Sequence, residues 1–164
     1  MKKNIDLELT SAEKQQLRER KVSLKALRDH APDEIAAMIN ASAERTKELF
    51  ALIEFQSIPS LGLGFAKELI VQGYYALDQL KGKSAVELFD AYEMHCGCWA
   101  DPCVEDSYRL LVHYIEHRDE SKRWWDFTKD RKAYRAEFGF PADRPVVAWY
   151  ETGKYPKADA YMKG

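Results

Sequence analysis

The chain has few cysteines, no long apolar run and no excess of charge of one sign, and each absence excludes a class of protein. Three cysteines occur in 164 residues, and an odd number cannot all pair within one chain. A disulfide scaffold is therefore disfavoured, and a reducing, cytoplasmic location is expected. No apolar segment approaches the roughly 18 residues that a membrane span needs. The lysines near the N-terminus precede no apolar core, so we expect neither a secretory signal nor a membrane partner.

The charge balance also limits the function. The formal net charge is -2, with 46% hydrophobic and 32% charged residues. This composition is that of an ordinary globular domain with a buried core. Dedicated nucleic-acid binders usually carry a basic excess, so the whole-chain charge argues against strong non-specific DNA affinity, although a small local patch remains compatible with it.

Helix signals recur along the chain and predict an all-α fold. Thr10 with Glu13 forms a capping-box pattern, and Ser84 with Glu87 forms a second. Pro32 suits a first helical position, and Asp101 followed by proline is a strong helix start. The expected helical segments are 11–30, 33–41, 43–55, 65–72, 84–95, 103–119 and 124–140. The only strand candidate is "VVAWY", 146–150.

The pattern along the chain predicts one globular domain in three parts. Residues 1–42 are expected to be helices that pack on a core formed by 43–120. The remaining part, 121–164, is expected to be a helix followed by an aromatic-rich, largely irregular arm. Ten of the chain's twenty aromatic residues lie from Trp124 onward. Because disordered segments are poor in aromatics, we expect this arm to pack back on the helical body.

The stretch "IPSLGLGFAKEL", 58–69, is unusual in a chain so rich in helix formers. It is typical of a helix-hairpin-helix, in which two antiparallel helices are joined by a turn of the type h-P-G-h-G-x-x-x-A. Glycines in such a turn let the backbone approach a phosphate closely. The next helix begins there, with unpaired N–H groups and the positive end of its dipole directed outward. This combination makes an anion site that requires no side chain.

Two positions depart from the pattern. Ser60 stands where the first glycine usually lies, and Gly64 occupies a place where a lysine often reaches the DNA backbone. The first change costs backbone freedom, and the second removes a cation worth about 1 kcal/mol near a phosphate. Both weaken the case for DNA while leaving the predicted fold intact.

The continuation strengthens the pattern, with "GYYALDQLKGKSAVEL" from Gly73 and "DPCVEDSYRLLVHY" from Asp101. Together, Phe55 to about His117 resembles the bacterial "pathogenicity locus" family of helix-hairpin-helix proteins, and is similar to the C-terminal domain of the competence regulator TfoX. The resemblance implies an all-helical fold with a tandem helix-hairpin-helix (SAM-like) core and a DNA-binding role, but no known reaction. In related hairpins the turn carbonyls can hold a monovalent cation.

The resulting hypothesis is a non-enzymatic binding protein that contacts duplex or single-stranded DNA without reading sequence. Such binding is steeply salt-sensitive. The same scaffold also serves as a protein-interaction module, which is the main alternative and predicts a protein partner and no DNA affinity. The expected DNA-contacting residues are Ser60, Leu61, Gly62, Leu63, Gly64 and Lys67 in the first hairpin, and Lys81, Gly82 and Lys83 in the second.

A third hypothesis, a small zinc-dependent enzyme, comes from the segment "HCGCWADPC". It gathers four soft metal ligands, His95, Cys96, Cys98 and Cys103. The spacing lacks a C-x-x-C knuckle, and core or loop cysteines explain it better. The dipole of a helix starting at Pro102 should lower the thiol pKa of Cys103. His113 lies about three helical turns away, too far to act as its base, so we expect no catalytic residue, no metal and no cofactor.

Overall fold

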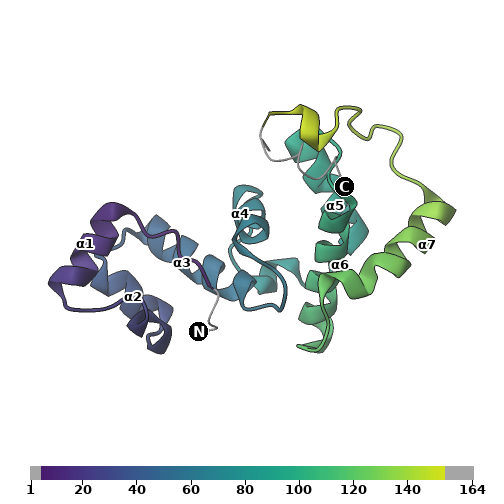
Figure 1. The fold of residues 1–164 in the computed structure, drawn as a ribbon. Coiled ribbons are helices and arrows are strands. Elements are labelled where there is room, and N and C mark those ends of the chain that lie inside the picture. Colours follow the sequence, from purple (N-terminus) through teal and green to yellow (C-terminus); the bar gives the residue numbers. More distant parts are fainter. Residues whose placement is uncertain (1–4, 154–164) are drawn as a thin grey trace, which may run out of the picture. The chain divides into compact units, whose positions relative to one another are not determined.

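The computed structural model describes residues 5–153, which are almost entirely helices and connecting turns (Figure 1). An all-α fold is thereby confirmed for this range. The α-helices are α1 (Ser11–Glu19), α2 (Pro32–Met38), α3 (Ala43–Gln56), α4 (Leu63–Val71), α5 (Ala85–Cys96), α6 (Pro102–His117) and α7 (Thr128–Phe138). The 3-10 helices are η1 (Ala26–Asp29), η2 (Leu77–Leu80), η3 (Trp124–Phe127) and η4 (Trp149–Glu151).

The strand expected at 146–150 is wrong. In the described range this segment makes one isolated parallel bridge, between Trp99 and Ala148, and then turns into η4. Within this segment Ala148 is buried, whereas Val146 is 90% exposed. The part of the expected arm beyond 153 lies outside the described residues.

The chain divides into two compact units, 1–81 and 82–164. The division falls inside the range 43–120 that the sequence suggested as one core, and the three-part organisation stays a prediction. Within the described residues, no helix combines the length and apolarity needed to cross a membrane.

The first unit is built around α1, η1, α2 and α3. The predicted capping box is confirmed, because the Glu13 backbone donates to Thr10 Oγ1 at 3.1 Å and the Thr10 backbone donates to Glu13 Oε2 at 2.9 Å. Pro32 begins α2, as its fixed φ favours. The buried apolar side chains of this core are Leu7, Leu17, Leu27, Ile35, Ala36, Ile39 and Leu49.

Arg45 on α3 links three parts of the first unit. Its guanidinium donates to Glu13 Oε1 at 2.8 Å, to Glu48 Oε2 at 2.7 Å and to the Leu7 carbonyl at 2.8 Å. Burial alone would raise the pKa of the Glu13 carboxyl. The hydrogen bonds from Arg45 and from the Thr10 backbone outweigh burial and lower that pKa below its usual value.

The second unit is organised by α5 and α6. The Tyr108 ring of α6 is fully buried, and its centroid lies 6.4 Å from that of Phe89 and 5.9 Å from that of Tyr92. The predicted start of α6 is confirmed, since Asp101 Oδ1 accepts from the Cys103 backbone at 2.8 Å and a proline follows. At the start of α5, Ser84 Oγ accepts from the backbone of the residue three positions on at 3.5 Å, which is half of the expected capping box.

Candidate nucleic-acid interface

A six-residue turn, 57–62, joins α3 to α4, which pack against each other (Figure 1). Ile58 and Leu61 are buried and anchor the turn, and the Leu61 backbone donates to the Ile58 carbonyl at 3.3 Å. Ala66, one turn into α4, is 1% exposed. The chain therefore leaves one helix and starts the next at the place where the sequence predicted the hairpin.

Ser60 adopts the left-handed conformation that glycine favours. Its φ is +63°, a region in which an L-residue other than glycine costs about 1–2 kcal/mol. The departure from the expected glycine therefore preserves the shape of the turn at an energetic cost. The cost in backbone freedom expected from this serine is thus located in its positive φ.

Gly62 and Gly64 are both exposed, and the fold itself requires neither glycine. Gly62 is the N-cap of α4 with φ -107° and ψ -174°, and no side chain caps the helix. Neither glycine has a positive φ, and a Cβ added at either would meet nothing within 4 Å. A glycine inside a helix costs about 1 kcal/mol relative to alanine. Gly64 thus weakens α4, and both glycines leave its first turn without a covering side chain.

The first backbone donors of α4 have no acceptor in the described part of the chain. The Ala66 N–H closes the first helical bond, to the Gly62 carbonyl at 3.1 Å. Within residues 5–153 no group accepts from the N–H groups of Gly62, Leu63 or Gly64. The first turn of α4 also carries no acidic side chain. Open donors and an unopposed helix dipole favour an anion at this position.

Lys67, the expected side-chain contact, forms an ion pair. Its Nζ lies 2.8 Å from Glu8 Oε1, and the two side chains are 49% and 35% exposed. The hydrogen bond to Glu8 raises the pKa of Lys67, so this side chain is firmly cationic. An exposed pair of this kind is worth about 0–1 kcal/mol, so a phosphate can replace Glu8 at little cost.

The second predicted contact, Lys81-Gly82-Lys83, lies where the two units divide. Gly82 has φ +74°, a conformation that demands glycine. Lys81 Nζ is 2.6 Å from Asp78 Oδ1. The preceding helix, η2, has only four residues, and the first turn of α5 carries Glu87. This turn therefore offers a phosphate a less favourable setting than the first one does.

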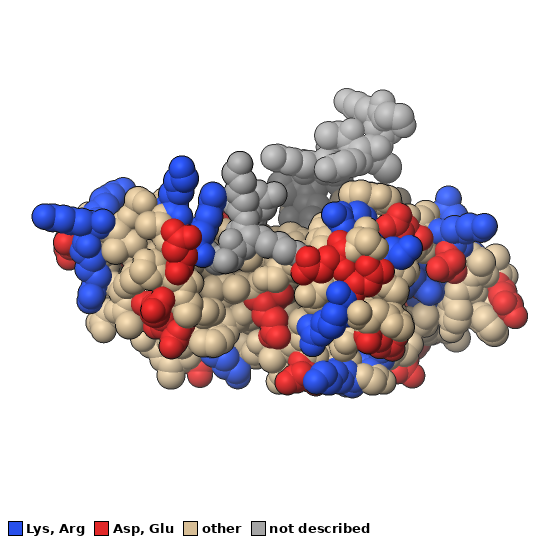
Figure 2. All heavy atoms as spheres, turned by 90° about the horizontal axis from the view of Figure 1, so that it is seen from below, with Lys and Arg blue, Asp and Glu red and all other residues tan. Residues whose placement is uncertain are grey.

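Charge is mixed on one face of the molecule. On the face drawn in Figure 2, basic and acidic side chains are interspersed, without a broad area of one sign. This agrees with the net charge of -2 and argues against a broad DNA-binding surface on this face.

The cysteine segment does not form a metal centre in the described structure. Cys98 is buried, Cys96 half-buried and Cys103 exposed. No group of three or more His, Cys, Asp or Glu side chains within 5–153 is placed to hold a metal ion. The zinc hypothesis thus loses its structural basis.

The expected activation of Cys103 by the helix dipole is wrong. Burial, and then the hydrogen bond and negative charge of Asp101, raise the pKa of the Cys103 thiol to about 11. Desolvation of the thiol and the Asp101 carboxylate together therefore outweigh the dipole. His113 contacts Asp119, with Nε2 to Oδ2 at 3.1 Å.

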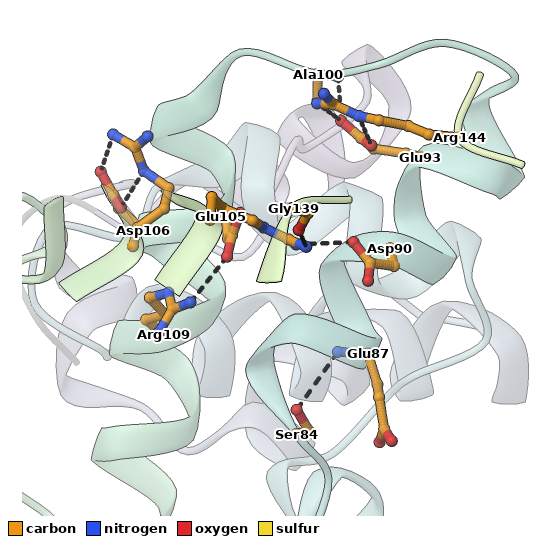
Figure 3. A network of polar contacts seen from close by, with 12 residues as sticks. Ser84, Glu87, Asp90, Glu93, Ala100, Glu105, Asp106, Arg109, Gly139 and Arg144 are labelled. Carbon is orange, nitrogen blue, oxygen red and sulfur yellow. Dashed lines mark hydrogen bonds and ion pairs between the residues drawn. The ribbon is translucent and has the colours of Figure 1, made fainter. Parts of the chain in front are cut away.

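Sequence reasoning missed a network of buried ion pairs in the second unit. Figure 3 shows acidic residues of α5 and α6 facing arginines, several of which come from later in the chain. The buried carboxylates belong to Glu93, Glu105 and Asp106, each at most 1% exposed. Their partners include Arg131 and Arg135 on α7, which are four residues apart. The available signal in the sequence was this four-residue spacing, which places both arginines on one face of a helix where they can meet buried carboxylates.

Taken together, the described residues form an all-helical protein with a glycine-bearing turn between α3 and α4 and an open start of α4. The profile of the family described as "Pathogenicity locus" matches residues 48–133, just over half of the chain. The chain belongs to the pathogenicity locus family, and the matched range includes the hairpin and α4 to α6. No curated protein and no solved structure matches the chain.

Proposed function

We propose that the chain is a non-enzymatic binding protein whose α3–turn–α4 segment acts as a helix-hairpin-helix and contacts the phosphate backbone of DNA. The likeness to the TfoX C-terminal domain and the tandem arrangement are parts of this proposal. The observation that carries it is the open start of α4, where Gly62 and Gly64 are exposed without any structural need for glycine. Because neither glycine has a Cβ atom, an anion can approach the backbone donors closely.

The proposed contacts are mostly backbone groups. The N–H groups of Gly62, Leu63 and Gly64 would donate to phosphate oxygens, and the Lys67 ammonium would exchange Glu8 for a second oxygen. Such contacts position the protein on the backbone without reading bases. With one or two phosphates neutralised, log K should fall against log salt with a slope of about -1 to -2. The turn carbonyls could also hold a monovalent cation, as in related hairpins.

A substitution at the N-cap of α4 separates the effect of this turn on stability from its proposed contact with DNA. In Gly62→Ser the hydroxyl can accept from the N–H groups of the first turn, which improves the cap by a few tenths of a kcal/mol. The same hydroxyl takes the place that a phosphate oxygen would occupy. We therefore expect the variant to be at least as stable as the native chain and to bind DNA several-fold more weakly.

The measurement is fluorescence anisotropy of labelled duplex and single-stranded oligonucleotides at low and moderate salt. Lys67→Gln should reduce the salt slope, whereas Lys25→Gln, at an exposed lysine of the same unit, should not. Binding that Gly62→Ser and Lys67→Gln leave unchanged would exclude the hairpin as the DNA site. A native chain that binds neither oligonucleotide at low salt would exclude the proposed function itself.

Exposed apolar side chains favour a second candidate, a protein-interaction module. Phe50 on α3 is 45% exposed and Val71 at the end of α4 is 62% exposed. Apolar side chains presented by the two hairpin helices suit a protein partner better than a phosphate backbone. This candidate predicts no DNA affinity even at low salt, and association with a protein partner that Phe50→Ser weakens.

A further inference from the structure

The second unit contains a cavity of about 380 Å³ that the proposed DNA contact does not use. Its walls come from α5, α6, α7 and the segment that follows α7. The volume lies near the lower end of the range of about 300–1,000 Å³ that is common for small-molecule sites. The side chains that matter for its chemistry are Phe89, Trp99, Lys132, Arg135, Phe140 and Arg144.

The arginines of this cavity have their donor edges occupied by buried carboxylates (Figure 3). Arg144 donates through Nε and Nη2 to the two oxygens of Glu93, at 2.7 and 2.8 Å. Glu93 Oε1 also accepts from the Ala100 backbone at 2.7 Å, and its side chain is 1% exposed. These guanidinium N–H groups are consequently not available as a fork for an incoming phosphate.

Arg135 is engaged in the same way. It donates to Glu105 Oε2 at 2.9 Å, to Asp90 Oδ1 at 2.8 Å and to the Gly139 carbonyl at 3.0 Å. Its side chain is 8% exposed. With its edges bonded to protein, a guanidinium interacts with further groups mainly through its flat faces, which attract aromatic rings.

Several flat groups line the cavity. The Cζ atoms of Arg144 and Arg135 lie 3.5 Å and 4.2 Å from the Phe140 ring centroid, and Arg144 Cζ lies 5.7 Å from that of Trp99. Phe89 supplies another ring, 5.8 Å from Arg135 Cζ. Aromatic rings and guanidinium planes are surfaces on which a planar ring stacks.

The charge balance of the cavity leaves one positive charge. The charged lining residues and their direct ion partners include five cations, Arg109, Arg131, Lys132, Arg135 and Arg144, and four carboxylates, Asp90, Glu93, Glu105 and Asp106. Lys132 is the exposed member, and within residues 5–153 no carboxylate pairs with it. A ligand with a single anionic group would complete this balance.

We propose that this cavity binds a small molecule that joins a planar aromatic ring to one anionic group. The ring packs against the aromatic lining formed by Phe89, Trp99 and Phe140, and the anion pairs with Lys132 at the edge. A polyanion fits less well, because the Nε and Nη2 groups of Arg144 and all three guanidinium nitrogens of Arg135 are already bonded to protein groups. An uncharged ring would leave the lysine without a partner.

The test uses two matched pairs of probes on the full chain, by isothermal titration calorimetry. Indole-3-acetate and tryptamine share the indole ring but carry opposite charges. Adenosine 5′-monophosphate and ribose 5-phosphate share a phosphate, but only the first carries an aromatic base. We expect at least one of indole-3-acetate and adenosine 5′-monophosphate to bind. Tryptamine and ribose 5-phosphate should bind at least tenfold more weakly.

Two substitutions locate the binding. Lys132→Gln should weaken the anionic aromatic probe about fivefold or more, whereas Lys129→Gln, an equally exposed change on α7 outside the cavity, should not. Phe140→Ala should weaken the same probe, and circular dichroism establishes whether that variant is folded. Lys132→Gln keeps the test decisive if Phe140→Ala unfolds. Absence of binding by both aromatic anions at millimolar concentration, equal binding of tryptamine, or indifference to Lys132→Gln would overturn the proposal.

Discussion

Replacing Arg135 by methionine tests how much the buried ion-pair network stabilises the second unit. The guanidinium bonds Glu105, Asp90 and the Gly139 carbonyl at 2.8–3.0 Å, with the arginine side chain 8% exposed. Methionine fills much of the same volume but leaves both carboxylates without this cation. Breaking a buried pair by removing one partner costs about 3–5 kcal/mol.

Two features of the site place the expected loss at the lower end of that range. Glu105 keeps Arg109, whose Nη2 lies 3.0 Å from Oε1. Asp90 is 21% exposed, so water can partly solvate it once the arginine is gone. Methionine also retains apolar contact with Phe140. We therefore expect Arg135→Met to lower the free energy of unfolding by about 3 kcal/mol at neutral pH.

The loss should shrink as the pH falls. Burial already holds the pKa of the Asp90 carboxyl above its usual value, even with Arg135 beside it. Without that cation the folded-state pKa rises further above the unfolded one. The folded variant then binds more protons than the unfolded chain, so its stability decreases with rising pH and recovers on acidification.

Tryptophan fluorescence isolates the relevant unit, because all four tryptophans lie after residue 81. Urea unfolding followed by this signal reports on the second unit, and the matched control is Lys129→Met, an exposed change on the same helix. The control should shift stability by no more than about 0.5 kcal/mol. A loss below about 1 kcal/mol for Arg135→Met would refute the reasoning, since it would mean that these arginines behave as solvated surface groups.

Two further predictions concern titrating groups. Hydrogen bonds from Arg45 and Thr10 outweigh burial and lower the pKa of Glu13 in the folded state. The stabilisation from Glu13 is therefore complete at a pH above its unfolded-state pKa and is lost as the pH falls through its folded-state pKa. Glu13→Gln should weaken this loss of stability at acidic pH, as measured by circular-dichroism melts. The thiol pKa of Cys103, raised to about 11, predicts that its alkylation by iodoacetamide, mapped by peptide mass spectrometry, stays slow at neutral pH. Asp101→Asn should speed it there, and equal rates would contradict the assigned cause.

Local sequence signals predicted the helix starts well. Thr10, Pro32 and the Asp101–Pro102 pair each begin a helix as expected, because capping depends on residues within one turn of each other. The strand at 146–150 failed for the opposite reason. A strand exists only with a partner, and no local pattern shows whether one is present.

The buried network could not be predicted in the same way. Charged residues on α5, α6 and α7 look like the solvated faces of helices, which is what most charge runs are. Their burial depends on pairs separated by 25 to 51 residues, as for Arg131 with Asp106 and Arg144 with Glu93. The raised thiol pKa of Cys103 was likewise not predicted, because the dipole argument left out the desolvation of the thiol and the charge of the Asp101 carboxylate.

The two proposed sites recognise anions by opposite means, and this gives a way to tell them apart. At the start of α4 the donors are backbone N–H groups with no described acceptor, so a phosphate binds by direct hydrogen bonds and competes with salt. In the cavity the three guanidinium nitrogens of Arg135 and the Nε and Nη2 groups of Arg144 already donate to protein groups, and Lys132 is the exposed cation that can meet an anion. Aromatic anions should therefore bind there with weak salt dependence and leave DNA affinity unchanged. Competition between the two ligands would mean that one site, not two, accounts for both.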